Sequence, residues 1–363
     1  MGCPFCTLDS CVSIGAGPDS NLAFPCLCAI IDLQRHNDTE GGIQVIKKQF
    51  FAWALCFLLC GCGVMGETEE PVDTTAWLSM GMDFPIADTL PDGQGQAAKV
   101  IVLLGQSNAT GCSLTSYLQQ NVEPEEYAVF QEGFSSVWIN FCMDDHKYTS
   151  HGAFVPVSMN CGAGSGCFGP ELGMAQVLAQ AFPEEQIFIL KYTMSGYSLH
   201  HHWLCAGQRG SIYEACMRFI QTYMDDLLAK NYDAKIGAIC WMQGESDTTD
   251  FKAAHYFDNQ AAFAAYLRTD LAPYAQAGGI FFIDAGISDS PYCLPAYPAI
   301  NAAKERFAGL SPMNLYFSTI DAGLTTLHEP AGDPDLGHYD ALSELELGRL
   351  FGRYILQAYQ MWG

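Results

Sequence analysis

Five short apolar runs between residues 99 and 320 constrain the fold of this chain more than any other feature. None of them alternates apolar with polar residues, and strands of this kind are covered on both faces, as in parallel sheets. Segments with helical spacing separate the runs, and alternating strands and helices are typical of α/β folds. The sequence therefore predicts a three-layer sandwich, in which helices cover both faces of a mainly parallel sheet of about five strands. The predicted strands are 99–104, 187–192, 236–242, 280–287 and 315–320, and the predicted helices lie near 170–182, 211–230, 252–271, 298–307 and 341–361.

One segment of the predicted domain shows no clear period. Residues 113–169 are rich in Cys, Gly and aromatic residues, and we interpret them as a long insertion that helps to shape a cleft. Apart from this insertion, residues 99–363 are expected to form one domain, and residues 63–98 a linker and lead-in.

The charge of the chain excludes one class of partner. The sequence has 40 Asp and Glu against 16 Lys and Arg, which gives a formal net charge of −24. A protein of that sign repels phosphate backbones, so nucleic-acid binding is not expected. Hydrophobic residues make up 49% and charged residues 15% of the sequence, which is too apolar a composition for a disordered chain.

The stretch around residue 50 has the layout of an export signal. Lys47 and Lys48 precede an uncharged apolar run at 50–64, in which small residues follow the apolar core. The run is shorter than the roughly 20 residues that span a bilayer, so we favour a signal peptide at 45–62 over a permanent transmembrane anchor. Residues 59–62 (LCGC) also resemble a bacterial lipobox, which makes Cys62 a candidate for lipidation. We therefore expect a secreted or periplasmic protein, or a cell-surface lipoprotein.

Residues 1–44 precede this signal and do not fit a signal peptide themselves. Paired cysteines such as Cys3 and Cys6 could bind zinc in a small module, but no apolar periodicity accompanies them. We favour a translation start near Val45, which would make residues 1–44 a non-native or disordered leader.

Candidate catalytic groups follow the predicted strands, where open α/β sheets bind their ligands. The first strand ends in Gly105, and the Ser107 hydroxyl follows it as a candidate nucleophile; a helix N-cap is the alternative role. A serine needs an imidazole to take its proton, and the imidazole needs a carboxylate to orient it. His338 and Asp335 supply these two groups just before the last predicted helix. Their spacing of three lets one short turn carry both.

Five blocks of this sequence together resemble the SGNH-hydrolase superfamily. They are VIVLLGQSNATG at 100–111, FGPELGMAQ at 168–176, SGYSLHHHW at 195–203, WMQGESD at 241–247 and DLGHYDALSELELG at 335–348. The chain is most similar to the sialate O-acetylesterase-like branch, which includes acetylxylan esterases of carbohydrate esterase family six. The resemblance covers roughly residues 99–355 and implies a flavodoxin-like sandwich. It also implies removal of acetyl groups from sugar hydroxyls through an acyl-enzyme, with no metal and no cofactor.

Carried onto this chain, the resemblance implies roles for named residues. Ser107 is the nucleophile, His338 the general base and then acid, and Asp335 its orienting partner. The backbone N–H groups of Ser107 and Gly196 and the side-chain amide of Gln243 are the predicted oxyanion donors. The residues predicted to support the loops or contact the substrate are Asn108, Glu245, Tyr197, His200 and Trp203.

The sequence departs from the family pattern beside Gly196. Relatives usually have a second glycine in this block, whereas here Ser195 precedes Gly196 and Tyr197 follows it. Three consecutive histidines at 200–202 raise the possibility of a metal site, although adjacent residues of an extended segment point to opposite sides. We expect polar contact with a sugar or surface exposure instead, and Trp203 to stack on a sugar ring or to pack. A disulfide between Cys161 and Cys167 is also possible in an exported protein.

The sequence thus predicts an exported serine esterase that deacetylates a sugar or a polysaccharide, with a membrane contact only through an N-terminal lipid. Two alternatives remain open at this stage. One is a catalytically silent carbohydrate-binding protein on the same fold, and the other is a lipase or thioesterase of the wider superfamily.

Overall fold

The computed structural model describes residues 84–362. The predicted leader at 1–44, the signal peptide at 45–62, Cys62 and the lead-in up to residue 83 lie outside the described residues. No helix in the described range is both long enough and apolar enough to cross a membrane.

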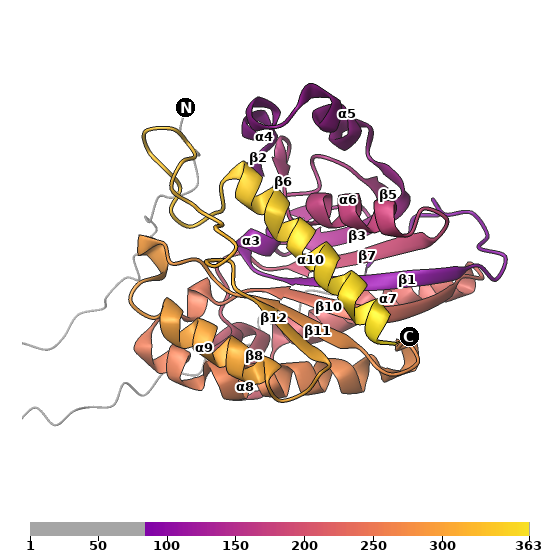
Figure 1. Cartoon of the computed structure of the whole chain (residues 1–363). Coiled ribbons are helices and arrows are strands. Elements are labelled where there is room, and N and C mark those ends of the chain that lie inside the picture. Colours follow the sequence, from indigo (N-terminus) through magenta and orange to yellow (C-terminus); the bar gives the residue numbers. More distant parts are fainter. Residues whose placement is uncertain (1–83, 363) are drawn as a thin grey trace, which may run out of the picture. The chain divides into compact units, whose positions relative to one another are not determined.

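A twisted sheet with six parallel strands forms the centre of the molecule (Figure 1). The strand order is β12-β11-β10-β1-β7-β3-β4, and β5 pairs with β3. The short strands β4 (Tyr148–Thr149) and β5 (Val155–Val157) are antiparallel to β3. The parallel strands are β1 (Ala97–Gly105), β3 (Phe134–Met143), β7 (Gln186–Thr193), β10 (Asp233–Met242), β11 (Phe281–Ala285) and β12 (Asn314–Phe317).

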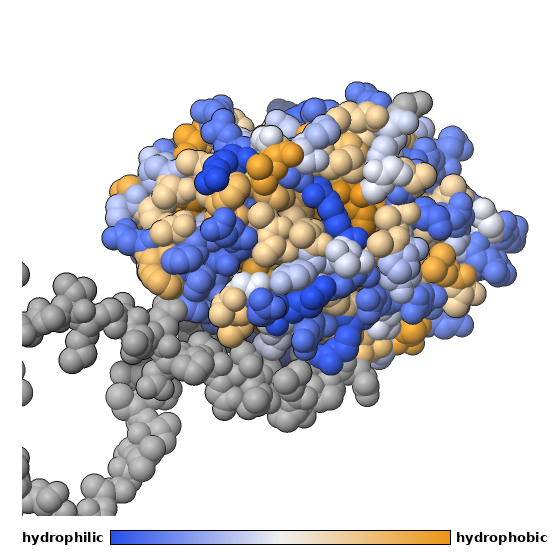
Figure 2. All heavy atoms as spheres, turned by 90° about the horizontal axis from the view of Figure 1, so that it is seen from below, coloured by the Kyte–Doolittle hydropathy of each residue, from blue (hydrophilic) through white to orange (hydrophobic). Residues whose placement is uncertain are grey.

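Helices cover both faces of this sheet, so the predicted three-layer α/β/α fold is confirmed. Helices α6 (Glu171–Ala181) and α10 (Ala341–Met361) pack together on one face, with α4 (Thr115–Asn121) and α5 (Pro124–Glu132) nearby. The other face carries α7 (Ser211–Ala229), α8 (Asp250–Asp270) and α9 (Tyr297–Ala308). Figure 2, seen from the side of α8 and α9, shows hydrophilic and hydrophobic side chains intermingled on the surface.

The short elements cluster mostly where strands turn into helices. They are the helix α3 (Ser107–Thr110), the single turns η1 (Leu199–Trp203), η2 (Glu245–Asp247), η3 (Ala272–Tyr274) and η4 (Pro291–Cys293), and the strand pairs β2 (Ser113–Leu114) with β6 (Cys167–Phe168) and β8 (Leu204–Cys205) with β9 (Gln208–Arg209).

The innermost strand, β1, is a continuous apolar run because both its faces are covered. Residues 100–104 have no exposed surface, and β1 pairs with β10 on one side and with β7 on the other. Burial of one such aliphatic side chain stabilises the fold by about 1.5–3 kcal/mol. This burial fixes the register of the strand that leads to Ser107.

The segment 113–169 is more than the insertion that the sequence suggested, because it contributes β3 to the central sheet. Strand β3 runs parallel to β7 from Val137 to Met143. Polar residues interrupt its apolar pattern, and one of them, Asn140, is buried and accepts a hydrogen bond from the Ser150 hydroxyl at 3.0 Å. Because a polar side chain is paired inside the core here, the sequence pattern did not predict a core strand.

Candidate active site

The carboxyl ends of β1, β7 and β10 converge on Ser107. Gly105 ends β1 with φ of +150°, and a Cβ atom there would lie 1.9 Å from the Met242 carbonyl oxygen, so only glycine allows this approach to β10. Ser107 is the first residue of α3 and is partly exposed, whereas the three residues that follow it are buried. Among the described residues, no hydrogen bond engages the Ser107 backbone N–H.

His338 and Asp335 meet in the loop that precedes α10. His338 Nδ1 and Asp335 Oδ2 are 2.7 Å apart, and their side chains are 28% and 54% exposed. The hydrogen bond to His338 lowers the pKa of Asp335, which therefore stays ionised. An ionised carboxylate at this distance places the neutral imidazole proton on Nδ1 and leaves Nε2 available as a base.

Asn108 ties this loop to the turn that carries Ser107. Its amide nitrogen donates to Glu245 Oε1 at 2.6 Å and to the Gly337 carbonyl at 3.2 Å. The Tyr339 N–H donates back to Asn108 Oδ1 at 3.2 Å. These bonds bracket His338 on both sides, and Asn108 is 2% exposed. The predicted supporting residue thus connects three separate segments of the chain.

His338 contacts a sulfur atom in this structure. Cys112 follows α3, its thiol lies 3.7 Å from the Ser107 carbonyl oxygen, and its sulfur is close enough to His338 to influence the pKa of that residue. Burial lowers the pKa of His338, but the hydrogen bond to Asp335 and the nearby Cys112 sulfur outweigh burial and raise it. No hydrogen bond joins Ser107 Oγ to His338 within the described residues. Catalytic hydrogen bonds often tighten only when substrate binds.

The end of β7 supplies Gly196. This residue has φ of +78°, and a Cβ atom added to it would meet nothing within 4 Å, so the space above it is open. In the described part of the chain its N–H makes no hydrogen bond. Ser195 holds the turn in place, because its N–H and hydroxyl donate to Asp144 Oδ1 and Oδ2 at 2.7 and 3.0 Å.

Asp144 is a site residue that the sequence analysis missed. It directly follows β3, and that strand lay in the segment interpreted as an insertion. The signal was a run rich in aromatic and β-branched residues that ends in two acidic residues, which is the pattern of a strand followed by a turn.

Gln243 follows β10 and is fully buried. Its amide nitrogen donates to Asp247 Oδ2 at 2.6 Å and lies within 3.4 Å of the Tyr197 carbonyl and 3.3 Å of Gln106 Oε1. The predicted oxyanion donor therefore sits beside the β1 and β7 turns, with its strongest hydrogen bond directed to Asp247.

Asp247 and Glu245 act as anchors in this structure. Asp247 accepts hydrogen bonds from the backbone N–H groups of Leu199 and His200 at 2.7 and 3.1 Å. Glu245 accepts one from Asn108, and its other oxygen has no partner among the described residues. Burial raises the pKa of both carboxyls.

Three further features of the sequence are described by the structure: Trp203, the pair Cys161 and Cys167, and the side chains that could hold a metal. Trp203 has no exposed surface and packs against Tyr192, Trp241 and Phe263, so packing and not sugar stacking accounts for it. The structure does not join Cys161 to Cys167 by a disulfide. No group of three or more His, Cys, Asp or Glu side chains converges as a metal site would within residues 84–362.

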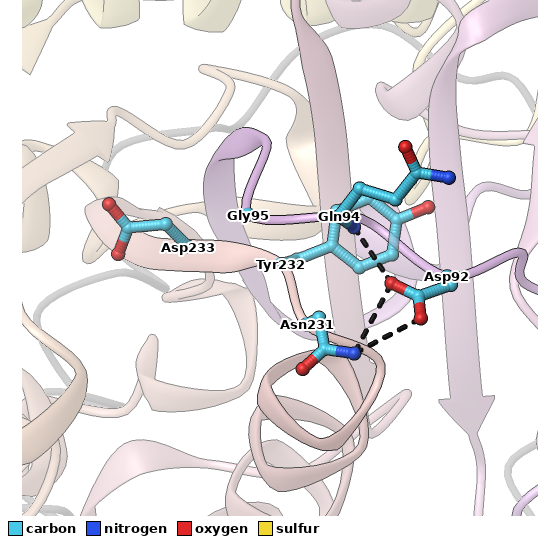
Figure 3. A pocket seen from close by; sticks show the side chains of 6 residues that line it. All are labelled: Asp92, Gln94, Gly95, Asn231, Tyr232 and Asp233. Carbon is cyan, nitrogen blue, oxygen red and sulfur yellow. Dashed lines mark hydrogen bonds between the residues drawn. The ribbon is translucent and has the colours of Figure 1, made fainter.

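An open hollow of about 550 Å³ lies at the opposite edge of the sheet (Figure 3). It is lined by Asp92, Gln94, Gly95, Asn231, Tyr232 and Asp233, next to the first residues of β1 and β10. In Figure 3 the Asn231 amide reaches both carboxylate oxygens of Asp92, at 3.1 and 3.2 Å. The hollow contains no candidate nucleophile or imidazole, so the strand-end site remains the candidate.

Replacement of Asn108 by alanine should disconnect the Ser107 turn from the His338 loop. We expect kcat on p-nitrophenyl acetate to fall by about 10²-fold with little change in KM, because a small misplacement of catalytic groups costs rate more than binding. Asn121→Ala is the matched control, since the Asn121 amide bonds only within its own helix, to the Tyr117 carbonyl. A wild-type kcat in Asn108→Ala, at unchanged melting temperature, would contradict this role.

Known proteins share the family and the fold of this chain. The family model "Carbohydrate esterase, sialic acid-specific acetylesterase" matches residues 97–357. A search of curated proteins finds no match. The crystal structure of a protein from Arabidopsis thaliana is similar with 17% identity and a TM-score of 0.50, and the match covers 74% of this chain and 99% of that one.

The crystal structure of NanS is also similar, with 15% identity and a TM-score of 0.51, over 75% of this chain and 99% of NanS. Likeness at this level of identity shows a shared fold. The family model reaches further, because it spans the central sheet from the start of β1 into α10. The chain therefore belongs to the carbohydrate esterase family of sialic acid-specific acetylesterases, and it is a carbohydrate esterase.

Proposed function

We propose that the protein removes O-acetyl groups from a carbohydrate through an acyl-enzyme formed on Ser107. The observation that carries this proposal is the Asp335–His338 hydrogen bond, in a loop that Asn108 connects to the Ser107 turn. A hydroxyl, an imidazole and a carboxylate held in this order are the parts of a serine-hydrolase triad.

In the first half-reaction, Ser107 Oγ attacks the acetyl carbonyl carbon while His338 Nε2 takes the hydroxyl proton. The tetrahedral intermediate then collapses, the bond to the sugar oxygen breaks, and His338 returns the proton to that oxygen. In the second half-reaction, His338 takes a proton from the water that attacks the acetyl-serine. The bond from the acyl carbon to Ser107 Oγ then breaks, His338 returns the proton to Oγ, and acetate leaves. Asp335 holds the imidazole tautomer and stabilises the imidazolium in both halves.

The oxyanion of each intermediate needs preset donors. The N–H groups of Ser107 and Gly196 suit this role, since neither is engaged by another described residue and the space at Gly196 is open. Gln243 is the proposed third donor. To bind the oxyanion, the Gln243 amide must give up one of its two long contacts, to Gln106 at 3.3 Å or to Tyr197 at 3.4 Å. Its shorter bond to Asp247 keeps the amide in place.

Ser107→Ala should abolish the release of acetate from p-nitrophenyl acetate and from acetylated xylan. Removal of a triad nucleophile commonly lowers kcat by about 10⁶-fold, so only background hydrolysis should remain. Ser158→Ala is the control, because the partly buried Ser158 hydroxyl donates to the neighbouring Met159 carbonyl and carries no proposed chemistry. Full activity in Ser107→Ala would reject the nucleophile assignment. A wild-type chain that binds acetylated xylan without hydrolysing it would instead be a silent sugar-binding protein.

The pH dependence should report the contact between His338 and Cys112. A protonated His338 cannot accept the Ser107 proton, so kcat/KM should rise as pH rises through the pKa of His338. Asp335 and Cys112 both favour the cation, and removal of Cys112 therefore shifts the inflection of the pH profile to lower pH. Cys205→Ala, at another partly exposed cysteine, should leave the profile in place. The same inflection in Cys112→Ala and wild type would show that the sulfur does not act on the base.

Export is part of the proposal, supported by the charged, apolar and small residues at 45–62. Mass spectrometry of the mature protein from its native host should find an N-terminus downstream of residue 45. Diacylglycerol on Cys62 would identify a lipoprotein, and an unmodified terminus a freely secreted one. A mature chain that begins upstream of residue 45 would reject the proposed start and signal.

A further inference from the structure

Six neighbouring rings form a row that leads away from Gly196 to the first turns of α8. We call it the ring row, and its members are Tyr197, His202, His201, His200, Phe251 and His255. From Tyr197 to Phe251, successive ring centroids are 4.7, 6.2, 4.6 and 5.2 Å apart, and each pair is nearly perpendicular. Edge-to-face packing of this kind holds rings in fixed positions before any ligand arrives.

The inner end of the row belongs to the framework of the candidate site. Tyr197 directly follows Gly196, and its carbonyl lies 3.4 Å from the Gln243 amide nitrogen. Asp247 bonds the same amide and also the backbone N–H groups of Leu199 and His200. One buried carboxylate thus fixes both the oxyanion region and the turn that carries the histidines.

His202 offers an uncharged hydrogen-bond donor in this row. The Ser198 N–H donates to His202 Nδ1 at 3.1 Å, so a neutral His202 carries its proton on Nε2. Burial, and then the nearby His201 and Lys252, lower the pKa of His202 to about 4. At neutral pH the residue is therefore an imidazole with one N–H and an apolar ring face, which matches the hydroxyls and C–H faces of a sugar.

The charges around the inner end disfavour an anionic ligand. Asp144 and Asp145 lie close enough to Tyr197 that, after burial, their charges contribute to the rise of its pKa. Lys252, a cation of the described residues that lies near the row, has its ammonium 3.4 Å from the Ser246 carbonyl oxygen. Two carboxylates against one ammonium repel a sugar acid and leave a neutral sugar unaffected.

The outer end of the row is open to solvent. Phe251 is 50% exposed, and His255 is exposed one turn later on α8, with its ring centroid 4.7 Å from that of Phe251. Phe251 thus continues the row that begins beside Gly196 and leaves part of its ring accessible to a ligand. With Trp203 buried in the core, these two rings are the ones that a sugar can reach at this end.

We propose that the ring row binds a neutral oligosaccharide chain, so that sugar units beyond the acetylated one contribute to substrate binding. This inference rests on the proposed deacetylase function and adds its substrate class: a neutral chain of several units, held along the row by ring faces and by the His202 N–H.

Chain-length dependence tests the proposal. The measured quantity is the ratio of kcat/KM on acetylated xylotetraose to kcat/KM on acetylated methyl xyloside. In the wild type this ratio should exceed one, and in the double variant Phe251→Ala/His255→Ala it should fall about tenfold, which corresponds to about 1.4 kcal/mol of lost binding. Leu310→Ala is the control, since Leu310 is 60% exposed but precedes β12, at the opposite edge of the sheet.

A second measurement separates binding from catalysis. In a Ser107→Ala background, calorimetric titration with acetylated xylotetraose should give a Kd about tenfold higher when Phe251 and His255 are also replaced. An unchanged ratio and an unchanged Kd would overturn the subsite and leave the proposed function intact. Hydrolysis by Ser107→Ala would reject the proposed nucleophile, while the titration would still report on the row. If the double variant also loses about tenfold in kcat/KM on O-acetylated N-acetylneuraminic acid, the assignment to a neutral chain is overturned.

Discussion

The buried ammonium of Lys191 holds together the parts of the structure on which the site depends. Its Nζ bonds Glu171 Oε2 at 2.6 Å, the Thr110 carbonyl at 2.9 Å and the Cys161 carbonyl at 3.0 Å, and both Lys191 and Glu171 have no exposed surface. These contacts join the end of α3, a loop of the 113–169 segment and the start of α6 to β7. A buried charge must find all its partners at once, because an uncompensated one costs several kcal/mol. The turn that carries Ser107 therefore cannot move independently of the sheet.

A second buried carboxyl lies near the pair formed by Lys191 and Glu171. Glu344 lies in the first turn of α10, is buried, and neither of its oxygens has a partner among the described residues. Burial, and then the charge of Glu171, raise the pKa of Glu344 well above its usual range, whereas the Lys191 ammonium lowers it. Of these two buried carboxyls, Glu171 is the one that bonds the Lys191 ammonium.

The sequence predicts most of this fold because five of the strands are mainly apolar and show no alternation of apolar and polar residues, as is typical of strands in a sheet covered on both faces. Strand β3 escaped prediction because Asn140 and two serines break its pattern, and only a tertiary contact, the Ser150 hydroxyl, explains a buried amide there. Asp144 was missed for the same reason, since it follows β3. Cys112 was missed because a single cysteine has no spacing to interpret, and its relevance comes from the fold that brings His338 to it. The candidate residues at the ends of apolar runs were predictable because parallel strands end at one edge.

The exposure of the Asp335–His338 pair bears on which contacts position the His338 imidazole in the proposed triad. Asp335 is 54% exposed, and a charge so close to water is screened, which limits what its attraction for the imidazole can contribute. The backbone on either side of His338 is held instead by Asn108, which is buried and whose amide is held in turn by Glu245. A buried hydrogen bond of fixed geometry loses little to solvent. The imidazole is thus positioned chiefly through the buried amide, and Asp335 chiefly selects which ring nitrogen carries the proton.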